Sequence, residues 1–250
     1  MNVKAKASAN DFCNNQFILK SIYSRNMCAR FTITKDQKEL LDAFTAKTID
    51  PDYHENYNLA PTQLAPVIIS QKPEAIQLFH FGLIPFWSKD KKSSFSMMNA
   101  RQETVLENKT YKPLMTHNKR CLVLADGFYE WKTEGKKKLP YRFTLLNREI
   151  FAFAGLWSQW KSEDKKEIYE SFTILTTTPN EQVAKLHNRM PVILTKEEEK
   201  LWLSDEVPPK DLISLCDPYP AEEMAMYAVS TEVNKATNNH QDLILPMNSQ

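Results

Sequence analysis

The chain has 250 residues, of which 42% are hydrophobic and 25% are charged, and these values are ordinary for a globular protein. Its formal net charge of +1 excludes a generic polycation that coats nucleic acid, so any DNA binding would need a local basic groove. No apolar run reaches the roughly 20 residues of a membrane-spanning helix, so we expect no membrane association.

Residues 1–26 differ in composition from the rest of the chain. They contain no Gly or Pro and hold four basic and one acidic side chain, which leaves 28 basic and 30 acidic side chains in residues 27–250. Their longest apolar run is too short for a secretory signal. We interpret residues 1–26 as an extension upstream of a misassigned start codon, with a propeptide or a disordered tail as alternatives. Residues 27–250 are expected to form the folded domain.

The first predicted elements after this extension are a helix and a pair of strands. A capping box that begins at Thr34 predicts a helix over about 35–47. Two runs with strand-like composition, 65–70 and 76–82, are predicted to pair around a turn at 72–74.

The second half of the chain continues mainly as strands, separated by short turns. Further strands are predicted at residues 120–125, 128–133, 141–146, 150–155 and 171–177. A hairpin turn is expected at 134–136. A second capping box, which begins at Thr178, predicts a short helix over about 179–187, and a third at 195–198 begins another helix.

This order of elements indicates the fold class. Strands are many, helices are few, and strands rarely alternate with helices. We therefore expect a single α+β domain with a mostly antiparallel, barrel-like sheet and a few short helices. The chain has only four glycines, and each is expected where the backbone leaves no alternative; Gly127 is the most informative of them.

The cysteines argue against a metal or disulfide framework. They are Cys13, Cys28, Cys121 and Cys216, and no two of them form a CxxC pair. We therefore predict no metal site, no disulfide and no cofactor, in a reducing cytoplasmic setting.

Cys28 can become an N-terminal residue because it follows Met27. If translation starts at Met27, the small second residue allows the initiator Met to be removed, and Cys28 becomes the N-terminus. Its α-amine then has a pKa of about 7.7–8.0, far below the value of about 10.4 for lysine, and is more nucleophilic at neutral pH. An N-terminal cysteine can condense with an aldehyde to a thiazolidine. The ordinary alternative is a buried structural cysteine.

Four other segments stand out along the chain. They are Gly82-Leu83-Ile84-Pro85-Phe86-Trp87, Asn99-Ala100-Arg101-Gln102-Glu103-Thr104, Asp126-Gly127-Phe128-Tyr129-Glu130-Trp131 and His187-Asn188-Arg189-Met190-Pro191. Taken singly, each has an ordinary structural explanation, such as a surface ion pair for the arginines or core packing for the tryptophans.

Met27-Cys28-Ala29-Arg30-Phe31 and the last three of these segments, in this order along the chain, resemble the SRAP family of abasic-site processing proteins over about residues 27–246. Two features depart from the family pattern. Ala29 stands where the family usually has Gly, and residues 1–26 would block the α-amine of Cys28 unless they are absent or removed.

The resemblance implies a factor of the DNA damage and SOS response. It would bind single-stranded DNA at an abasic site and form a covalent crosslink in a single turnover. Cys28 would be the nucleophile and Glu130 the acid/base, with a pKa open to elevation by Tyr129 and Trp131. His187 would donate to the sugar or phosphate, and Asn99 would position the Cys28 backbone or the sugar.

The DNA would be held by the remaining residues of these segments. Arg30, Arg101 and Arg189 would contact phosphates, and Phe86 with Trp87 would stack against bases. The implied protein is a monomer in the cytoplasm of a bacterium, associated with the nucleoid.

The same residues allow two alternative functions. A cysteine with His, Asn and Glu also fits a thiol autopeptidase, or hydrolase, that removes its own N-terminal leader. A non-catalytic module that binds single-stranded nucleic acid, with the extension retained, is the second alternative.

Overall fold

The computed structural model describes residues 29–91, 97–164 and 166–247. Its centre is a closed barrel of five strands in the order β11 (Ile168–Thr177), β10 (Phe151–Lys161), β7 (Arg120–Ala125), β4 (Leu64–Ile69) and β5 (Lys72–Phe81). β5 pairs in turn with β11 and closes the circle. The β5–β11 pairing is parallel and the other pairs in the barrel are antiparallel.

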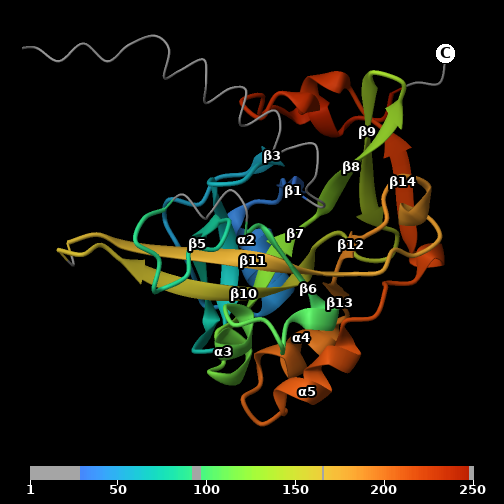
Figure 1. The fold of residues 1–250 in the computed structure, drawn as a ribbon. Coiled ribbons are helices and arrows are strands. Elements are labelled where there is room, and N and C mark those ends of the chain that lie inside the picture. Colours follow the sequence, from blue (N-terminus) through green and yellow to red (C-terminus); the bar gives the residue numbers. More distant parts are fainter. Residues whose placement is uncertain (1–28, 92–96, 165, 248–250) are drawn as a thin grey trace, which may run out of the picture.

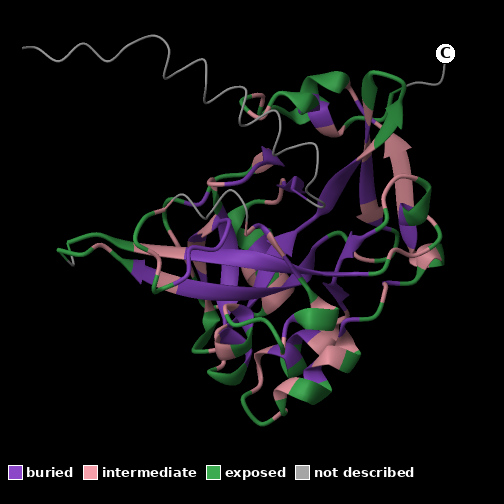
Figure 2. Cartoon of the chain, in the orientation of Figure 1, coloured by how far each residue is buried: buried purple, intermediate pink, exposed green. Residues whose placement is uncertain are grey.

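The barrel strands form because their apolar side chains fill the interior. β7 is buried along its whole length, and the first eight residues of β10 are buried as well. Aromatic rings interlock inside: Phe31 packs edge-on against Phe81 and Phe153, with ring centroids 5.5 and 5.8 Å apart. Figure 2 shows the buried residues concentrated on these strands. Figure 1 shows β10 and β11 continuing past the barrel as a long hairpin.

A second sheet stands beside the barrel, in the strand order β14 (Met224–Ala228), β9 (Lys137–Leu145), β8 (Gly127–Glu134), β1 (Phe31–Ile33) and β3 (Asn56–Leu59). It is antiparallel throughout. β7 of the barrel runs directly into β8 of this sheet, with only Asp126 between them. Of the connections between the two sheets, the one from β7 to β8 is the shortest and consists of a single residue.

Shorter elements complete the fold. The helices α3, α4 and α5 gather at one end of the barrel in Figure 1. The helices are α2 (Gln37–Phe44), α3 (Tyr111–Thr116), α4 (Lys196–Leu203) and α5 (Pro209–Leu212), and the short strands are β2 (Thr48–Ile49), β6 (Asn99–Arg101), β12 (Met190–Pro191) and β13 (Ile193–Leu194). The 3-10 turns are η2 (Gln102–Thr104), η3 (Val183–Lys185), η4 (Ile213–Leu215), η5 (Ala221–Glu223), η6 (Thr231–Asn234) and η7 (Gln241–Ile244).

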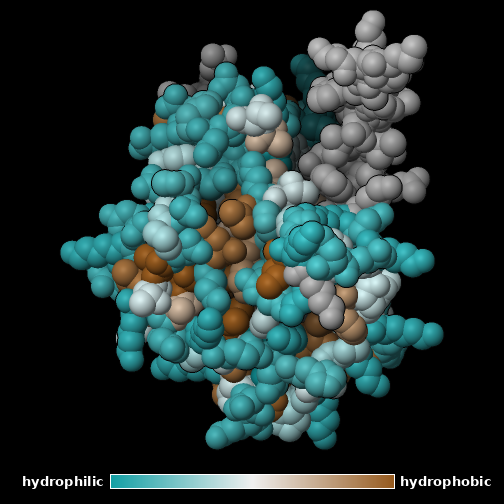
Figure 3. Space-filling view, turned by 90° about the vertical axis from the view of Figure 1, so that its left-hand side faces the viewer, coloured by the Kyte–Doolittle hydropathy of each residue, from teal (hydrophilic) through white to brown (hydrophobic). Residues whose placement is uncertain are grey.

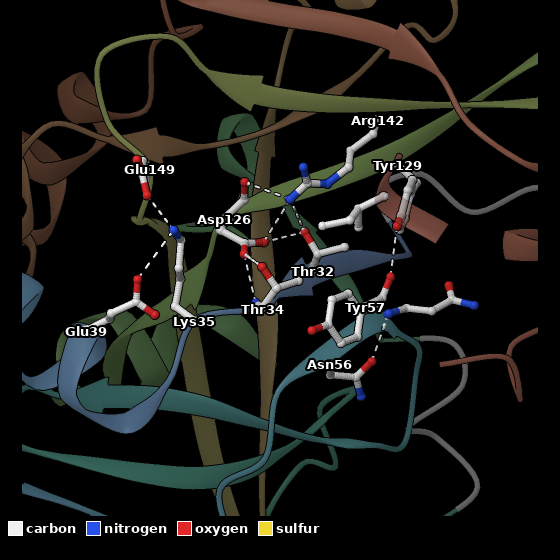
Figure 4. A network of polar contacts seen from close by, with 12 residues as sticks. Thr32, Thr34, Lys35, Glu39, Asn56, Tyr57, Asp126, Tyr129, Arg142 and Glu149 are labelled. Atoms are coloured by element: carbon white, nitrogen blue, oxygen red, sulfur yellow. Dashed lines mark hydrogen bonds and ion pairs between the residues drawn. The ribbon is translucent and has the colours of Figure 1, made fainter. Parts of the chain in front are cut away.

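A buried polar network surrounds the bend at Asp126 (Figure 4). The Asp126 carboxylate forms an ion pair with Arg142 of β9, at 3.1 Å, and accepts hydrogen bonds from the hydroxyls of Thr32 and Thr34. The backbone N–H of Thr34 donates to the same carboxylate at 2.8 Å. The network connects β1 and the residue after it to both β9 and the bend.

Gly127 follows the bend because the Arg142 guanidinium occupies the space where a side chain would begin. A Cβ at this position would lie 2.7 Å from Nε of Arg142. Gly127 was expected where the backbone leaves no alternative, but its φ is not positive, and it is the Arg142 side chain that leaves no room for a Cβ.

The predicted fold class is confirmed, and so is each predicted strand, with boundaries shifted by up to six residues. The β4–β5 hairpin turns at Ser70 and Gln71, before the predicted turn at 72–74. Residues 1–26 lie outside the described residues, so their assignment as an extension stays a prediction.

The predicted helix at 35–47 exists, but it is shorter and is capped by a different residue. Thr34 is not the cap because its N–H and hydroxyl both donate to Asp126. Asp36 caps α2 instead, in a capping box with Glu39, and the helix ends before Thr45, which has a left-handed backbone with φ 52°.

The predicted helix at 179–187 is wrong. The Asn180 side chain accepts from the N–H groups of Gln182 and Val183, and only the 3-10 turn η3 follows. The side-chain amides of Asn180 and Gln182 also donate to the carbonyls of Tyr219 and Ala221, which hold the segment in an irregular path. The capping box at 195–198 is confirmed as the start of α4.

Helices in the described ranges are all too short or too polar to span a membrane.

Replacement of Gly127 by Ala should lower the free energy of unfolding by about 1–3 kcal/mol, because the new methyl group must displace a buried guanidinium. Urea denaturation monitored by fluorescence measures this change. The control is Gly135→Asn in the β8–β9 turn, where a Cβ has nothing within 4 Å and Asn tolerates the left-handed backbone. Equal stability of the Gly127→Ala variant and the wild type would contradict the role given to Gly127.

Candidate DNA-reaction site

Glu130 lies on β8 and is buried, with 3% of its surface exposed. Successive side chains of a strand alternate between faces, so Glu130 shares the face of Phe128, which belongs to the main core. Tyr129 and Trp131 lie on the opposite face, where their rings are 6.4 Å apart and Tyr129 donates to the Tyr57 carbonyl at 2.8 Å. The alternation of the strand places both rings on the opposite face from the Glu130 side chain, and elevation of the Glu130 pKa by these residues stays a prediction.

The N-terminal end of β1 runs alongside Glu130. Phe31 pairs with Phe128, and the Tyr129 N–H donates to the Arg30 carbonyl at 3.0 Å. The next residue toward the N-terminus, Ala29, is therefore level with Glu130. Ala29 is 7% exposed and shares the core-facing side of the strand with Phe31. Cys28 and Met27 lie outside the described residues.

Asn99 and His187 come from two segments that meet at the end of β11. β6, which begins at Asn99, pairs in parallel with β11, and β12 pairs with the last two residues of β11. Arg189 connects the two segments: its guanidinium forms a forked ion pair with Glu103, beyond β6, and donates to the Thr176 carbonyl at 2.6 Å. The Arg189 guanidinium also lowers the pKa of Glu103.

The local contacts of His187 and Asn99 restrict what each can do. The His187 Nδ1 accepts a hydrogen bond from the Arg189 N–H at 3.1 Å, so a neutral imidazole carries its proton on Nε2 and can donate it. Burial raises the pKa of Tyr111 to about 12, and its protonated hydroxyl donates to the Asn99 carbonyl at 3.4 Å. The Asn99 backbone is therefore held while its side chain is half-buried.

Two of the three predicted phosphate-binding arginines are buried. Arg30 is 5% exposed, and its guanidinium donates to Asn58 and to the Val233 carbonyl. Arg189 is 9% exposed and holds Glu103. Arg101, at the end of β6, is exposed. Phosphate binding by these arginines stays a prediction, and Arg101 is the one of the three that already faces solvent.

Phe86 and Trp87 protrude from the loop that follows β5, with 63% and 61% of their surfaces exposed. The loop itself is fixed to the β10–β11 hairpin: the Ile84 N–H donates to the Ser171 hydroxyl at 2.8 Å, and the Trp160 indole N–H donates to the Ser88 carbonyl at 2.7 Å. The aromatic pair therefore stands on a rigid support, as a base-stacking surface requires.

Two cavities lie elsewhere on the molecule. One, of about 330 Å³, opens between residues 52–56 and strands β4 and β5, and one of about 400 Å³ lies between α2, β4 and α4. Asn99, Glu130 and His187 line neither. Figure 3, which faces the hairpin side of the molecule, shows apolar side chains in a hollow bordered by polar ones. Among the described residues no cluster of His, Cys, Asp and Glu could hold a metal ion.

The sequence did not reveal the buried ion pairs that connect the strands and loops of the candidate site. Asp126 and Arg142 were not identified as a buried ion pair, although Gly127 marked the close approach of the guanidinium. Glu103 was part of a recognised segment, but its partner Arg189 is 86 positions away and no local pattern connects the two.

Comparisons with known proteins agree with the resemblance found in the sequence. The family described as SOS response associated peptidase (SRAP) matches residues 27–236. The abasic site processing protein YoqW of Bacillus subtilis (strain 168) is 42% identical over 224 residues, which cover 87% of this chain and 99% of that protein. The abasic site processing protein HMCES of Gallus gallus is 31% identical over 227 residues, covering 78% of this chain and 67% of that protein.

The fold has a counterpart among solved structures. The X-ray crystal structure of a protein from Bacteroides thetaiotaomicron superposes with a TM-score of 0.74 at 28% identity, covering 82% of this chain and 93% of that one. The paired strands, the recognised segments and these relatives lead to one conclusion: the chain belongs to the SRAP family.

Proposed function

We propose that the chain binds single-stranded DNA at an abasic site and links itself to the lesion through Cys28 as its mature N-terminus. The product is a thiazolidine crosslink that shields the lesion during the SOS response to DNA damage. Membership of the SRAP family and the names of the curated relatives support processing of abasic sites. The covalent step, the single-stranded substrate and the place of action in a bacterial nucleoid are parts of the proposal.

The pairing of β1 with β8 is the observation that carries the proposal. It brings Ala29 level with Glu130, whose carboxyl is buried. Cys28 precedes Ala29 directly in the chain. A free amine on Cys28 would therefore be close to a carboxyl group that can transfer protons.

The proposed reaction is balanced without any redox partner. The abasic deoxyribose opens from its hemiacetal to an aldehyde, with proton transfer by Glu130. The Cys28 amine adds to the aldehyde carbon and water leaves, which gives an imine. The Cys28 thiol then adds to the same carbon and closes a five-membered ring.

The other predicted site residues have roles that suit their positions. His187, with its proton on Nε2, would donate to the sugar hydroxyl or a phosphate. Asn99 would position the Cys28 backbone or the sugar through its amide. Arg101 would contact a phosphate, and Phe86 with Trp87 would stack on bases next to the lesion.

The description of the family as a peptidase favours one second candidate function. Cys28 would act on the bond that precedes it and release residues 1–27. This reaction ends with the same N-terminal cysteine that the crosslinking proposal requires. It differs in needing no DNA.

The start of the chain decides between these functions. A chain that begins at Cys28 should form an adduct with abasic single-stranded DNA that survives heat and SDS, whereas a chain that retains Met1 should form none. Cys28→Ala should abolish the stable adduct, because an imine without the thiol is reversible. Denaturing gels with labelled DNA and intact-mass measurement of each chain test these statements. Release of residues 1–27 from the full chain without DNA, in a Cys28-dependent manner, would support the peptidase function instead.

Glu130→Gln should slow adduct formation by about 100-fold or more, because an amide cannot exchange the proton that ring opening needs. Affinity for abasic DNA should change little. Glu134→Gln is the matched control, since Glu134 lies on the same strand and is exposed. Wild-type rates for the Glu130→Gln variant in single-turnover kinetics would remove this residue from the mechanism.

Trp87→Ala should weaken binding of single-stranded DNA by about 1–3 kcal/mol, the usual contribution of one stacked base. Leu146→Ala is the control, because Leu146 is similarly exposed, at 59%, at the end of β9 in the other sheet. Fluorescence anisotropy with a labelled oligonucleotide measures both. Unchanged affinity for the Trp87 variant would exclude this residue from the DNA surface.

A further inference from the structure

We propose that Asp126 is a positioning residue for the crosslinking reaction. Through Thr32 and Thr34 it sets the position of β1 along β8, and with it the point at which the chain before Ala29 meets Glu130. This inference rests on the proposed function and names a residue that acts on the same site from a distance.

β1 is a short strand, and its pairing with β8 is regular and is extended by backbone hydrogen bonds from Asp126 to Thr32 and from Tyr129 to Arg30. β1 has three residues, and its pairing with β3 is irregular between Phe31 and Ile33. Phe31 is buried among aromatic rings and fixes which face of the strand points inward. A shift by two residues would keep the same alternation of faces but would remove Phe31 from its aromatic neighbours and Arg30 from Asn58 and Val233, so these contacts favour the observed register.

Asp126 adds a further constraint on the register because both of its carboxylate oxygens are used. Oδ1 accepts from the Thr32 hydroxyl, and Oδ2 accepts from the hydroxyl and the N–H of Thr34. The two threonines are two positions apart, so the carboxylate can accept hydrogen bonds from both only when β1 is in the observed register (Figure 4). A slip by one residue would break these hydrogen bonds, and a slip by two residues could place only one of the two threonines at the carboxylate.

Arg142 holds the carboxylate in place. Its guanidinium donates to Asp126 Oδ1 at 3.1 Å, to the Thr32 hydroxyl at 3.0 Å and to the Tyr227 hydroxyl of β14 at 2.8 Å. The side chains of Arg142 and Asp126 are 8% and 4% exposed. The register of β1 is therefore tied to β8, β9 and β14 together.

The geometry of the reaction makes this register important. Ala29 is three residues from Thr32, a distance of about 10 Å along an extended strand. The reacting atoms must approach to about 3–3.5 Å, and a displacement of about 1 Å from that geometry can slow a reaction roughly 100-fold. A loosened β1 would spread the amine of Cys28 over positions that are mostly unproductive.

The test uses Asp126→Asn and Thr34→Val in chains that begin at Cys28. Asp126→Asn keeps an acceptor but removes the charge and one acceptor oxygen, and Thr34→Val removes one hydrogen bond to the carboxylate. Single-turnover crosslinking is measured over a range of abasic DNA concentrations. The amplitude of the reaction gives the fraction of folded, active protein. The half-saturating DNA concentration reflects the affinity for DNA, and the limiting rate constant reflects how well the Cys28 amine is positioned for reaction.

Glu199→Gln is the control, because Glu199 lies on α4, away from β1 and β8, and forms a buried ion pair with Arg148. We expect the limiting rate constant to fall roughly 10- to 100-fold in Asp126→Asn and by a smaller factor in Thr34→Val, with little change in half-saturation. Glu199→Gln should lower thermal stability and keep the wild-type rate constant.

Two negative results have different meanings. If the wild type forms the adduct and both Asp126→Asn and Thr34→Val keep its rate constant, with only amplitude or stability reduced, the positioning role is overturned and the proposed function stands. A wild-type chain beginning at Cys28 that forms no adduct would overturn the proposed function and this inference with it.

Discussion

The buried ion pair between Asp126 and Arg142 is the interaction on which the arrangement of the two sheets depends. It lies where β7 of the barrel becomes β8 of the second sheet, and its side chains are almost fully enclosed. Removing one partner of such a pair typically costs about 3–5 kcal/mol, because the other charge is left without compensation. Gly127 provides the space for the guanidinium, and Thr32 and Thr34 satisfy the remaining acceptor sites of the carboxylate.

The candidate site residues come from three parts of the chain, and different contacts hold each part in place. Asn99 and His187 belong to segments that Arg189 and Glu103 connect at the end of β11. Glu130 belongs to the second sheet, and Ala29 precedes its strand β1, which is hydrogen-bonded to the bend at Asp126. The aromatic pair Phe86 and Trp87 is carried by a loop fixed to the hairpin. The proposed reaction would need the Asn99 and His187 segments, Glu130 and the aromatic loop together, and polar contacts hold each of these three parts in place.

The sequence predicted the strands and the fold class because buried apolar runs such as β7 carry a clear local pattern. The predictions of helix boundaries were wrong where polar partners from distant parts of the chain determine the local structure. Thr34 has the composition of a helix cap but bonds to Asp126, and residues 179–187 favour a helix but are held by carbonyls of residues 219 and 221. The buried partners of Arg30 and Arg189, which are Asn58 and Glu103, could not be identified from spacing, and phosphate binding by these arginines stays a prediction. The segments that carry the family resemblance were recognisable because they are local.

The central claim is that Cys28 itself carries the bond to DNA, and peptide mapping of the adduct tests it most directly. The crosslinked protein is treated with nuclease and trypsin, and the modified peptide is identified by fragmentation in the mass spectrometer. We expect the sugar remnant on the peptide Cys28-Ala29-Arg30. The mass of the modified peptide should equal the sum of the masses of the peptide and the sugar remnant minus one water, and the peptide should carry no free thiol. A remnant on a lysine, or on any peptide that does not begin at Cys28, would contradict it.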